Sequence, residues 1–590
     1  MSTALRRIEM EVEGMTCPSC EIHVTERLSS VTGVKEAAVR YPDGTAHLTV
    51  EGGTPQTALV EALSGTPYSA RIVGEVPAVA DAVSAGPENA VGGAGATAVA
   101  SSTGAVAPER VGAPSWKGTG ARDRDGAPYD LAVVGAGSAG FAAAIKVAEA
   151  GGRVVMIQSG TLGGTCVNVG CVPSKAVIRA AEAQHVRAHH PFDGIARSDD
   201  PVDWNGVRRG KDDLVGALRQ AKYADVLAAY PGITLIEGWG TFDADGRLHL
   251  SDGSAVPARN VVVTTGSSPS IPDIPGLKDA GYLDSTALLD VGALPASLAV
   301  LGAGSVGLEL AQAYARLGVG VTILARSRLL SKGDPEVSDE LARHLRDEGL
   351  EVLTGVAVEK VERAGSMRRV HARTDDGPVT VEVEAILVAT GRRPNTAGMG
   401  LEEAGVELGP HGEIVVDERM RTALPHVYAA GDVTGEPMHV YVAAHAAAIA
   451  AENALGGDAT LDLSVLPLVT FTDPGVASVG LTEEQARARG IEPLVSTLPM
   501  EHVPRALAAR DTRGFVKLVA DASTRRIIGA HIVAHEGWEM IMEPAMAIRF
   551  RLTIEDLTTM LHPYLTLSEG VKLAALTFEK DVAKLSCCAV

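Results

Sequence analysis

The chain has 590 residues and a formal net charge of -21 at pH 7. Nucleic acids and anionic membrane surfaces favour clustered lysine and arginine, so this charge argues against either as the main partner. The length predicts about three or four domains. The first residues lack the apolar segment of a signal peptide, and the apolar run 131–148 is interrupted by glycines and a lysine. We therefore expect a cytoplasmic protein without a membrane span.

The six cysteines fall into three close pairs, which are Cys17 with Cys20, Cys166 with Cys171, and Cys587 with Cys588. A disulfide framework would spread its cysteines between distant segments, whereas close pairs in a reducing compartment indicate metal binding or redox chemistry. Two adjacent cysteines form only a strained disulfide ring, yet adjacent thiolates are well suited to hold a soft cation. The three pairs therefore predict one shared chemistry.

Residues 1–75 have the pattern of a small α/β unit. Strand, helix, strand, strand, helix and strand are predicted in that order, at 8–15, 17–28, 34–41, 45–50, 54–63 and 68–73. Alanine, glycine, valine, proline and serine dominate residues 76–127. This composition predicts a flexible linker with a reach of roughly 40 Å, enough for a tethered module to visit the rest of its own chain.

Two later segments repeat one pattern of strand, glycine turn, helix and strand. They read "YDLAVVGAGSAGFAAAIKVAEAGGRVVMIQ" and "SLAVLGAGSVGLELAQAYARLGVGVTILARSR". In such Rossmann-type units the first glycine allows a tight turn, the second lets the backbone approach a pyrophosphate, and the third lets helix and strand pack closely. Two dinucleotide sites are therefore predicted, with Gly135, Gly137 and Gly140 at the first and Gly302, Gly304 and Gly307 at the second.

The residues that end the second strand of each unit predict which dinucleotide binds. Arg326 and Arg328 stand where an NAD site has an acidic residue, and cations there suit a 2′-phosphate, which favours NADPH over NADH. The alternative is that these arginines only coat a strand end. In the first unit Gln158 replaces the acidic residue, and it can still hydrogen-bond a ribose.

The C-terminal part reads as an α+β domain. Strands are predicted in "GFVKLVA" and "IIGAHIV", followed by helices around 539–549 and 569–583.

Several motifs accompany the glycine turns, namely "GGTCVNVGCVPSK", "VVVTTG", "AILVATGRRPN" and "VYAAGDV". With them the chain resembles the pyridine nucleotide-disulfide oxidoreductases over about 129–590. The resemblance implies two Rossmann-type dinucleotide-binding domains and a C-terminal α+β dimerisation domain. It predicts an FAD-binding domain in two parts, 128–285 and 396–466, with an NADPH-binding domain, 286–395, between them. A dimerisation domain with a cysteine tail follows at 467–590.

The same resemblance assigns roles around the flavin. Asp432 would bind the ribityl chain, Lys175 would lie beside the reactive flavin nitrogen, and Glu309 would pair with Lys175. Cys171 would be the sulfur next to the flavin and Cys166 the outer sulfur. Thr165 and Gly266 belong to the same flavin motifs. The helix dipole and Lys175 are expected to lower the pKa of both thiols.

The C-terminal region bears on the substrate. Disulfide reductases of this family have a histidine and a glutamate here, but in "HPYLTLSEG" Tyr564 takes the histidine position, Glu569 remains, and His562 lies earlier. A phenol is a poor proton donor to a thiolate at neutral pH, which argues against a disulfide substrate.

The terminal "SCCA" is similar to that of the mercury(II)-reducing branch of the family, where such a tail reaches into the active site of the partner subunit. The resemblance implies that Cys587 and Cys588 take Hg(II) from solution thiols and pass it to Cys166 and Cys171 of the partner subunit. Tyr282 and Tyr564 match tyrosines that flank the metal, although each is equally consistent with a half-buried core phenol.

The motif "GMTCPSC" places Cys17 and Cys20 at the start of a helix. It resembles the ferredoxin-like heavy-metal-associated domains, which bind soft ions through both sulfurs. A thioredoxin-type CxxC is the competing interpretation, but the region is too short for that fold.

The expected protein is thus a homodimeric, FAD-containing, NADPH-dependent enzyme that reduces Hg(II) to Hg(0) in mercury detoxification. Two alternatives remain. One is a flavin disulfide reductase of dihydrolipoamide or glutathione type, and the other is a copper or zinc chaperone with a vestigial flavoprotein body.

Overall fold

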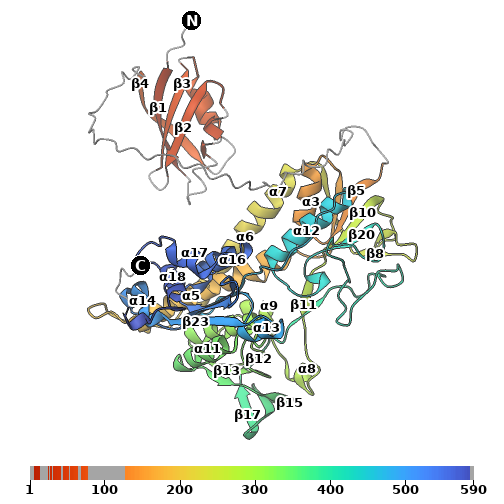
Figure 1. The fold of residues 1–590 in the computed structure, drawn as a ribbon. Coiled ribbons are helices and arrows are strands. Elements are labelled where there is room, and N and C mark those ends of the chain that lie inside the picture. Colours follow the sequence, from red (N-terminus) through yellow and green to blue (C-terminus); the bar gives the residue numbers. More distant parts are fainter. Residues whose placement is uncertain are drawn as a thin grey trace. The chain divides into compact units, whose positions relative to one another are not determined.

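The computed structural model describes residues 5–13, 24–25, 27–29, 31–40, 44–51, 53–63, 68–77 and 127–584. The chain divides into two compact units, 1–109 and 110–590 (Figure 1). Cys17, Cys20, Cys587 and Cys588 lie outside the described residues, as does nearly all of the predicted linker. Among the described residues, no helix combines the length and hydrophobicity that crossing a membrane requires.

The first unit is a four-stranded antiparallel sheet with the order β2-β3-β1-β4. Its elements are β1 (Leu5–Glu13), β2 (Val34–Arg40), β3 (Thr45–Glu51), α2 (Gln56–Glu61) and β4 (Ser69–Pro77). Every second residue of β1 is buried, at Ile8, Met10 and Val12, as the alternation of apolar and charged residues predicts. The strand order and the helix α2 agree with the predicted ferredoxin-like class.

The second unit begins with a five-stranded parallel sheet in the order β20-β10-β5-β6-β7. The sheet is assembled from segments far apart in sequence, because β20 pairs with β10 only after a whole further domain. Helices α3 and α12 lie side by side in Figure 1. The elements are β5 (Tyr129–Val134), α3 (Ser138–Glu149), β6 (Val154–Gln158), β7 (Ile233–Glu237), β10 (Ala258–Val263), β20 (Val427–Ala429) and α12 (Val440–Ala454).

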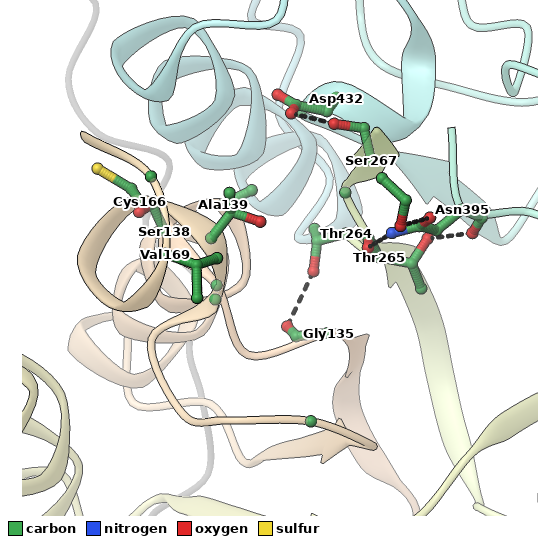
Figure 2. A pocket seen from close by; sticks show the side chains of 18 of the residues that line it. Gly135, Ser138, Ala139, Cys166, Val169, Thr264, Thr265, Ser267, Asn395 and Asp432 are labelled. Carbon is green, nitrogen blue, oxygen red and sulfur yellow. Dashed lines mark hydrogen bonds between the residues drawn. The ribbon is translucent and has the colours of Figure 1, made fainter. Parts of the chain in front are cut away.

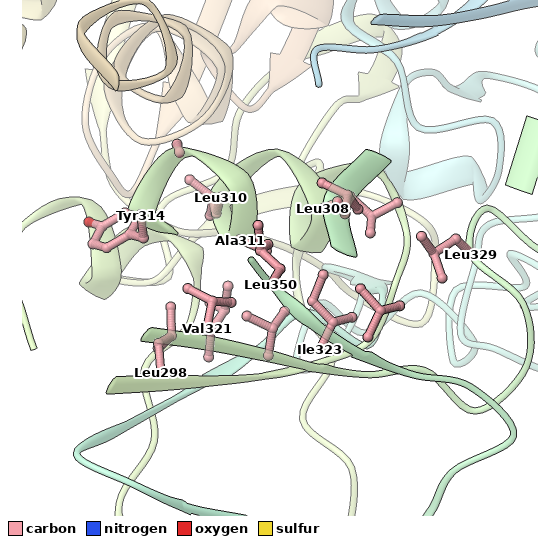
Figure 3. Packing of buried hydrophobic residues seen from close by; sticks show 14 of the residues in the cluster. Leu298, Leu308, Leu310, Ala311, Tyr314, Val321, Ile323, Leu329 and Leu350 are labelled. Atoms are coloured by element: carbon pink, nitrogen blue, oxygen red, sulfur yellow. The ribbon is translucent and has the colours of Figure 1, made fainter. Parts of the chain in front are cut away.

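The inserted domain has a parallel sheet with the order β14-β13-β12-β18 and an antiparallel sheet β15-β16-β17. Helix α10 packs its apolar face, with Leu308, Ala311 and Tyr314, over the parallel sheet (Figure 3). The elements are β12 (Ser297–Leu301), α10 (Ser305–Arg316), β13 (Gly320–Leu324), α11 (Pro335–Asp347), β14 (Glu351–Leu353), β15 (Ala357–Ala364), β16 (Met367–Thr374), β17 (Gly377–Val383) and β18 (Ala385–Val388).

The C-terminal part is an antiparallel sheet, β21-β22-β25-β24-β23, with helices α13 to α18. The helix predicted for 569–583 ends earlier, at Leu576, where the Thr577 hydroxyl donates to the Ala574 carbonyl and takes over a backbone partner. The elements are β21 (Leu468–Thr470), β22 (Gly475–Gly480), α13 (Glu483–Ala488), β23 (Pro493–Pro499), η3 (Met500–His502), α14 (Pro504–Ala509), β24 (Phe515–Asp521), β25 (Ile527–Ala534), α15 (Gly537–Met540), α16 (Met542–Arg549), α17 (Ile554–Thr559), α18 (Glu569–Leu576) and η4 (Val582–Lys584).

The remaining elements connect these sheets. They are α4 (Gly164–Asn168), α5 (Cys171–His189), α6 (Trp204–Arg219), η1 (Gln220–Ala224), α7 (Asp225–Ala229), β8 (Gly240–Phe242), β9 (Leu248–Leu250), β11 (Ser267–Pro269), α8 (Leu277–Ala280), α9 (Ser285–Leu289), β19 (Arg392–Pro394) and η2 (Asp432–Thr434).

Candidate active site

A cavity of about 810 Å³ lies at the carboxyl ends of the strands of the first parallel sheet. The first glycine turn, both cysteines of the CxxxxC motif and Asp432 line it together. Figure 2 shows Gly135, Cys166 and Asp432 around the cavity. Such a volume is typical of a site for a large organic cofactor. The location is also the usual one for ligands of open parallel sheets.

The glycine turn between β5 and α3 fits a pyrophosphate. Gly135 has a φ of +115°, and a Cβ atom there would overlap the Thr264 carbonyl oxygen. A Cβ atom at Gly140 would overlap the Gly135 carbonyl oxygen, so only glycine lets α3 pack this closely. The N-terminus of α3 therefore points its free amides at the cavity, which favours an anion.

Gln158, at the end of β6, lines the same cavity. Its side-chain carbonyl oxygen is buried and has no hydrogen-bond partner among the described residues. A buried acceptor of this kind is costly unless a ligand satisfies it. The hydroxyl of a ribose is a donor that fits, so this orphaned oxygen supports the predicted role of Gln158 at an FAD site.

Asp432 lines the same cavity and is held in place by two hydrogen bonds in series. The Ser267 hydroxyl donates to Asp432 Oδ2 at 2.6 Å (Figure 2). Arg392 donates from Nε to the Ser267 hydroxyl at 2.7 Å. Burial lowers the pKa of Arg392, and the Asp432 carboxylate opposes that effect. Thr165 and Gly266 also line the cavity. The sequence reasoning missed Arg392 and Ser267, although the motif "ATGRRPN" contains Arg392 and could have indicated it.

The two thiols sit where α4 and α5 meet. Cys171 is the first residue of α5 and is exposed, while Cys166 lies in α4 and is half-buried. A hydrogen bond from the Cys166 thiol and the charge of Lys175 lower the pKa of Cys171 to about 7, although burial opposes them. The hydrogen bond to Cys171 and burial instead raise the pKa of Cys166. The expectation that both pKa values fall was wrong for Cys166, because two sulfurs this close share one proton.

Lys175 follows Cys171 by one helical turn and shares its face of α5. Its ammonium Nζ lies 2.7 Å from Glu309 Oε2, which is the expected ion pair. Glu309 is almost fully buried in α10, and its other oxygen accepts the Phe471 backbone N–H at 3.0 Å. Lys175 Nζ also lies 4.5 Å from the centre of the Phe471 ring. One cation beside the thiol pair is therefore held by a carboxylate and an aromatic face.

The second glycine turn has the same design as the first. Gly302 has a φ of +109°, and a Cβ atom at Gly307 would overlap the Gly302 carbonyl oxygen. A Cβ atom at Gly304 would meet nothing within 4 Å, so the turn is open where a pyrophosphate would approach. Arg326 and Arg328 follow β13 and are exposed, and Arg328 donates to the Gly333 carbonyl at 3.0 Å. These features fit a dinucleotide with a 2′-phosphate.

The two predicted tyrosines lie apart from the cavity lining. Tyr282 is half-buried and packs against the core cluster beneath β15 and β16. Tyr564 is 50% exposed and belongs to the C-terminal part. Nearby, Glu569 accepts the Leu565 backbone N–H at 3.2 Å, and His562 bonds Glu543 at 2.7 Å. The metal-flanking role of the tyrosines stays a prediction.

We expect the pH dependence of thiol alkylation to report the shared proton. Because the pKa of Cys171 is lowered to about 7, its reaction with iodoacetamide should rise through pH 7 and level off above it. In Cys166→Ala the donor is gone and the rise should move toward pH 8.5 or so. Cys166→Ser, which retains a donor, is the matched control and should stay closer to the parent enzyme. A rise near pH 9 in the parent enzyme would contradict the expected pairing.

Comparisons with known families agree with this geometry. The model of the pyridine nucleotide-disulphide oxidoreductases matches residues 129–447, the dimerisation domain of that family matches 466–575, and a heavy-metal-associated domain matches 9–69. The chain therefore belongs to the pyridine nucleotide-disulphide oxidoreductase family. Enzymes of this family are NADPH-dependent flavoproteins, which confirms the predicted oxidoreductase class and the predicted FAD and NADPH.

The chain is similar to several mercuric reductases. It is 43% identical to that of Shigella flexneri, covering 98% of this chain and 99% of that protein. It is 39% identical to that of Lysinibacillus sphaericus, covering 99% and 100%. The enzyme of Streptomyces lividans is 48% identical over 78% of this chain and 98% of its own length.

Solved structures share the fold of the second unit. The HOCl-induced flavoprotein disulfide reductase RclA from Escherichia coli has a TM-score of 0.69 and 31% identity, covering 76% of this chain and 99% of RclA. LpdA from Mycobacterium tuberculosis has a TM-score of 0.67 and 31% identity, covering 76% of this chain and all of LpdA. Because RclA is a disulfide reductase, the fold alone does not decide between Hg(II) and a disulfide as substrate.

Proposed function

We propose that this protein is an NADPH-dependent flavoenzyme that reduces Hg(II) to Hg(0). The observation that carries the proposal is the thiol pair at the cofactor cavity, with one sulfur ionised near neutral pH beside Lys175, in a chain similar to mercuric reductases over nearly its whole length. The overall reaction takes bis-thiolate Hg(II) and NADPH to Hg(0), NADP⁺, two thiolates and a proton. Its atoms and electrons balance without a further reductant.

The residues that line the cavity have separate roles in the proposed reaction. Bound FAD supplies the chemistry that converts a hydride from NADPH into two electrons. Cys171 presents a thiolate, and Cys166 supplies the second sulfur once its proton has left. Hg(II) prefers two soft sulfur ligands, so the pair displaces the thiols that carried the ion in. Lys175 holds positive charge beside the sulfurs, and Glu309 keeps that charge in place.

Delivery of the metal is assigned to the two outer cysteine pairs. Cys587 and Cys588 of the partner subunit receive Hg(II) from solution thiols and hand it to Cys166 and Cys171. Cys17 and Cys20 of the heavy-metal-associated unit scavenge the ion upstream. The dimerisation domain supports a homodimer, and large apolar side chains on the same part of the chain are exposed, with Phe550 at 67% and Leu561 at 91%. Tyr282 and Tyr564 would flank the transferred ion.

The disulfide-reductase alternative makes a different demand on the same site. A departing thiolate needs a proton donor, and Tyr564 occupies the position where that family branch has a histidine.

The decisive assay is HgCl2-dependent oxidation of NADPH in excess thiol, with detection of mercury vapour. Purified protein should be yellow and release mercury. Equal turnover of lipoamide or glutathione disulfide, without mercury vapour, would favour the disulfide reductase. Metal binding without any turnover would favour the chaperone.

The choice of NADPH should depend on the two arginines after β13. In the double variant Arg326→Ala and Arg328→Ala we expect KM for NADPH to rise roughly 10- to 100-fold, because charged hydrogen bonds to the 2′-phosphate are lost. KM for NADH should change little. Arg343→Ala, which removes an exposed cation of α11 that is paired with Glu340, is the matched control. An equal rise of KM for NADPH and NADH would mean that these arginines do not bind the 2′-phosphate.

A further inference from the structure

Helix α10 carries a polar strip of which the predicted site explains only Glu309. Ser305, Glu309, Gln312 and Arg316 recur at the spacing of a single helix face. Each bonds the segment 470–474, which is the end of β21 and the link to β22 in the C-terminal sheet. The strip therefore joins the nucleotide-binding domain to the dimerisation domain along one line of contacts.

The contacts follow the segment residue by residue. The Ser305 and Thr470 hydroxyls lie 2.7 Å apart, and Glu309 accepts the Phe471 N–H at 3.0 Å. Gln312 accepts the Asp473 N–H at 2.8 Å and donates to the Asp473 carbonyl at 2.6 Å. Because the N–H and the carbonyl of Asp473 are both bonded by the Gln312 side chain, this backbone has little freedom to shift.

This fixed backbone presents the Phe471 ring to Lys175. The ring centre lies 4.5 Å from the Lys175 ammonium, within the range of a cation–π contact. Trp538 packs against the Phe471 ring, with the two ring centres 4.9 Å apart and the ring planes tilted by 39°. Trp538 in turn covers Gly475, where a Cβ atom would overlap its ring.

A second group of charges lies at the same small cavity as this aromatic pair. Asp473 bonds Arg316 at 2.8 Å and Arg513 at 3.0 Å. Although burial opposes them, a hydrogen bond from His535 and the charges of Arg513 and Arg316 hold the pKa of Asp473 well below its usual range. Asp473 is therefore a permanent carboxylate that attracts cations. Lys175, Asp473 and both aromatic rings line one small cavity, so the ammonium has a second carboxylate near it.

We propose that Phe471, supported by Trp538, is a positioning residue for the Lys175 ammonium. The dimerisation domain supplies an aromatic wall that keeps this cation at the cofactor cavity, paired with Glu309 rather than with Asp473. The inference rests on the proposed flavin site. It adds a specific role for the dimerisation domain beyond the assembly of the dimer. It predicts that the wall tunes the flavin, because a fixed positive charge stabilises the negative charge gained on reduction.

The test compares three variants of the flavin-loaded protein. Phe471→Leu keeps an apolar side chain but removes the aromatic face, and Phe471→Tyr keeps the face. Phe515→Leu makes the same truncation in β24 of the same domain. The equilibrium constant for flavin reduction is measured against a redox dye, and the rate of flavin reduction by NADPH is followed by stopped flow. In Phe471→Leu both should fall about three- to tenfold, with KM for NADPH unchanged. Phe471→Tyr should restore both, and Phe515→Leu should leave both unchanged.

Unchanged values in Phe471→Leu, failure of Phe471→Tyr to restore them, or an equal fall in Phe515→Leu would overturn the inference. If Phe471→Leu does not fold, Trp538→Leu removes the ring that packs against Phe471. The same fall in the equilibrium constant and rate of flavin reduction is expected, and unchanged values would again overturn the inference. The proposed function fails separately, because parent protein that binds no flavin, or whose flavin NADPH does not reduce, would refute the function itself. Normal reduction in the parent with no shift in the variants refutes only the role of Phe471.

Discussion

Replacing Cys171 with serine lowers kcat/KM for Hg(II) by at least about a thousandfold, because a serine hydroxyl is neither ionised at neutral pH nor a ligand for a soft metal. NADPH still reduces the bound flavin at the parent rate, since no sulfur takes part in that step. The measurement is stopped-flow absorbance of the flavin, together with steady-state NADPH oxidation under HgCl2 in excess thiol.

Cys166→Ser is the informative partner of this variant. Hg(II) reduction is lost to a similar extent, because one sulfur cannot hold the ion in its preferred two-coordinate geometry. The Cys171 thiolate remains, so the long-wavelength absorption of a thiolate next to oxidised flavin persists in Cys166→Ser and disappears in Cys171→Ser. Hg(II) turnover above one tenth of the parent rate in either variant would show that the pair is not the site of reduction.

The double variant Cys587→Ala and Cys588→Ala has the second largest expected effect. Its kcat/KM for Hg(II) bound to glutathione falls by roughly 100-fold or more, because bulky complexes then have to reach Cys166 and Cys171 without an intermediate pair of soft ligands. Flavin reduction by NADPH is unchanged. Stopped-flow and mercury-vapour measurements separate the two steps.

Ser586→Ala, in the same tail, is the matched control and keeps full activity. Titration with HgBr2, a small complex with weakly held ligands, should rescue much of the loss in the double variant. Parent-like turnover of the glutathione complex by the double variant would show that the tail is incidental to delivery.

The local parts of the site follow directly from short stretches of sequence. The turns at Gly135 and Gly302 adopt positive φ values, and Gly140 and Gly307 permit close helix packing, as the spacing of the glycines predicts. The position of Cys171 at the first turn of a helix follows from the same logic. In each case the residues that determine the geometry lie within a few positions of one another, so tertiary context adds little.

The environment of the charges could not be predicted in this way. The opposite shifts of the pKa values of Cys166 and Cys171 arise from a shared proton and from burial, and burial depends on every element that packs around the pair. The anchoring of Asp432 by Ser267 and Arg392 also joins three separate segments.

The sequence by itself thus determined the two dinucleotide-binding units, the three thiol pairs and the family, because contiguous motifs encode them through backbone geometry and residue chemistry. The tertiary structure alone placed the Phe471 ring next to Lys175 and bonded the Phe471 backbone to Glu309. That arrangement requires α5, α10 and the strand linker of the C-terminal sheet to dock together. The free energy of such docking comes from packing across domains, and no short stretch of residues records it.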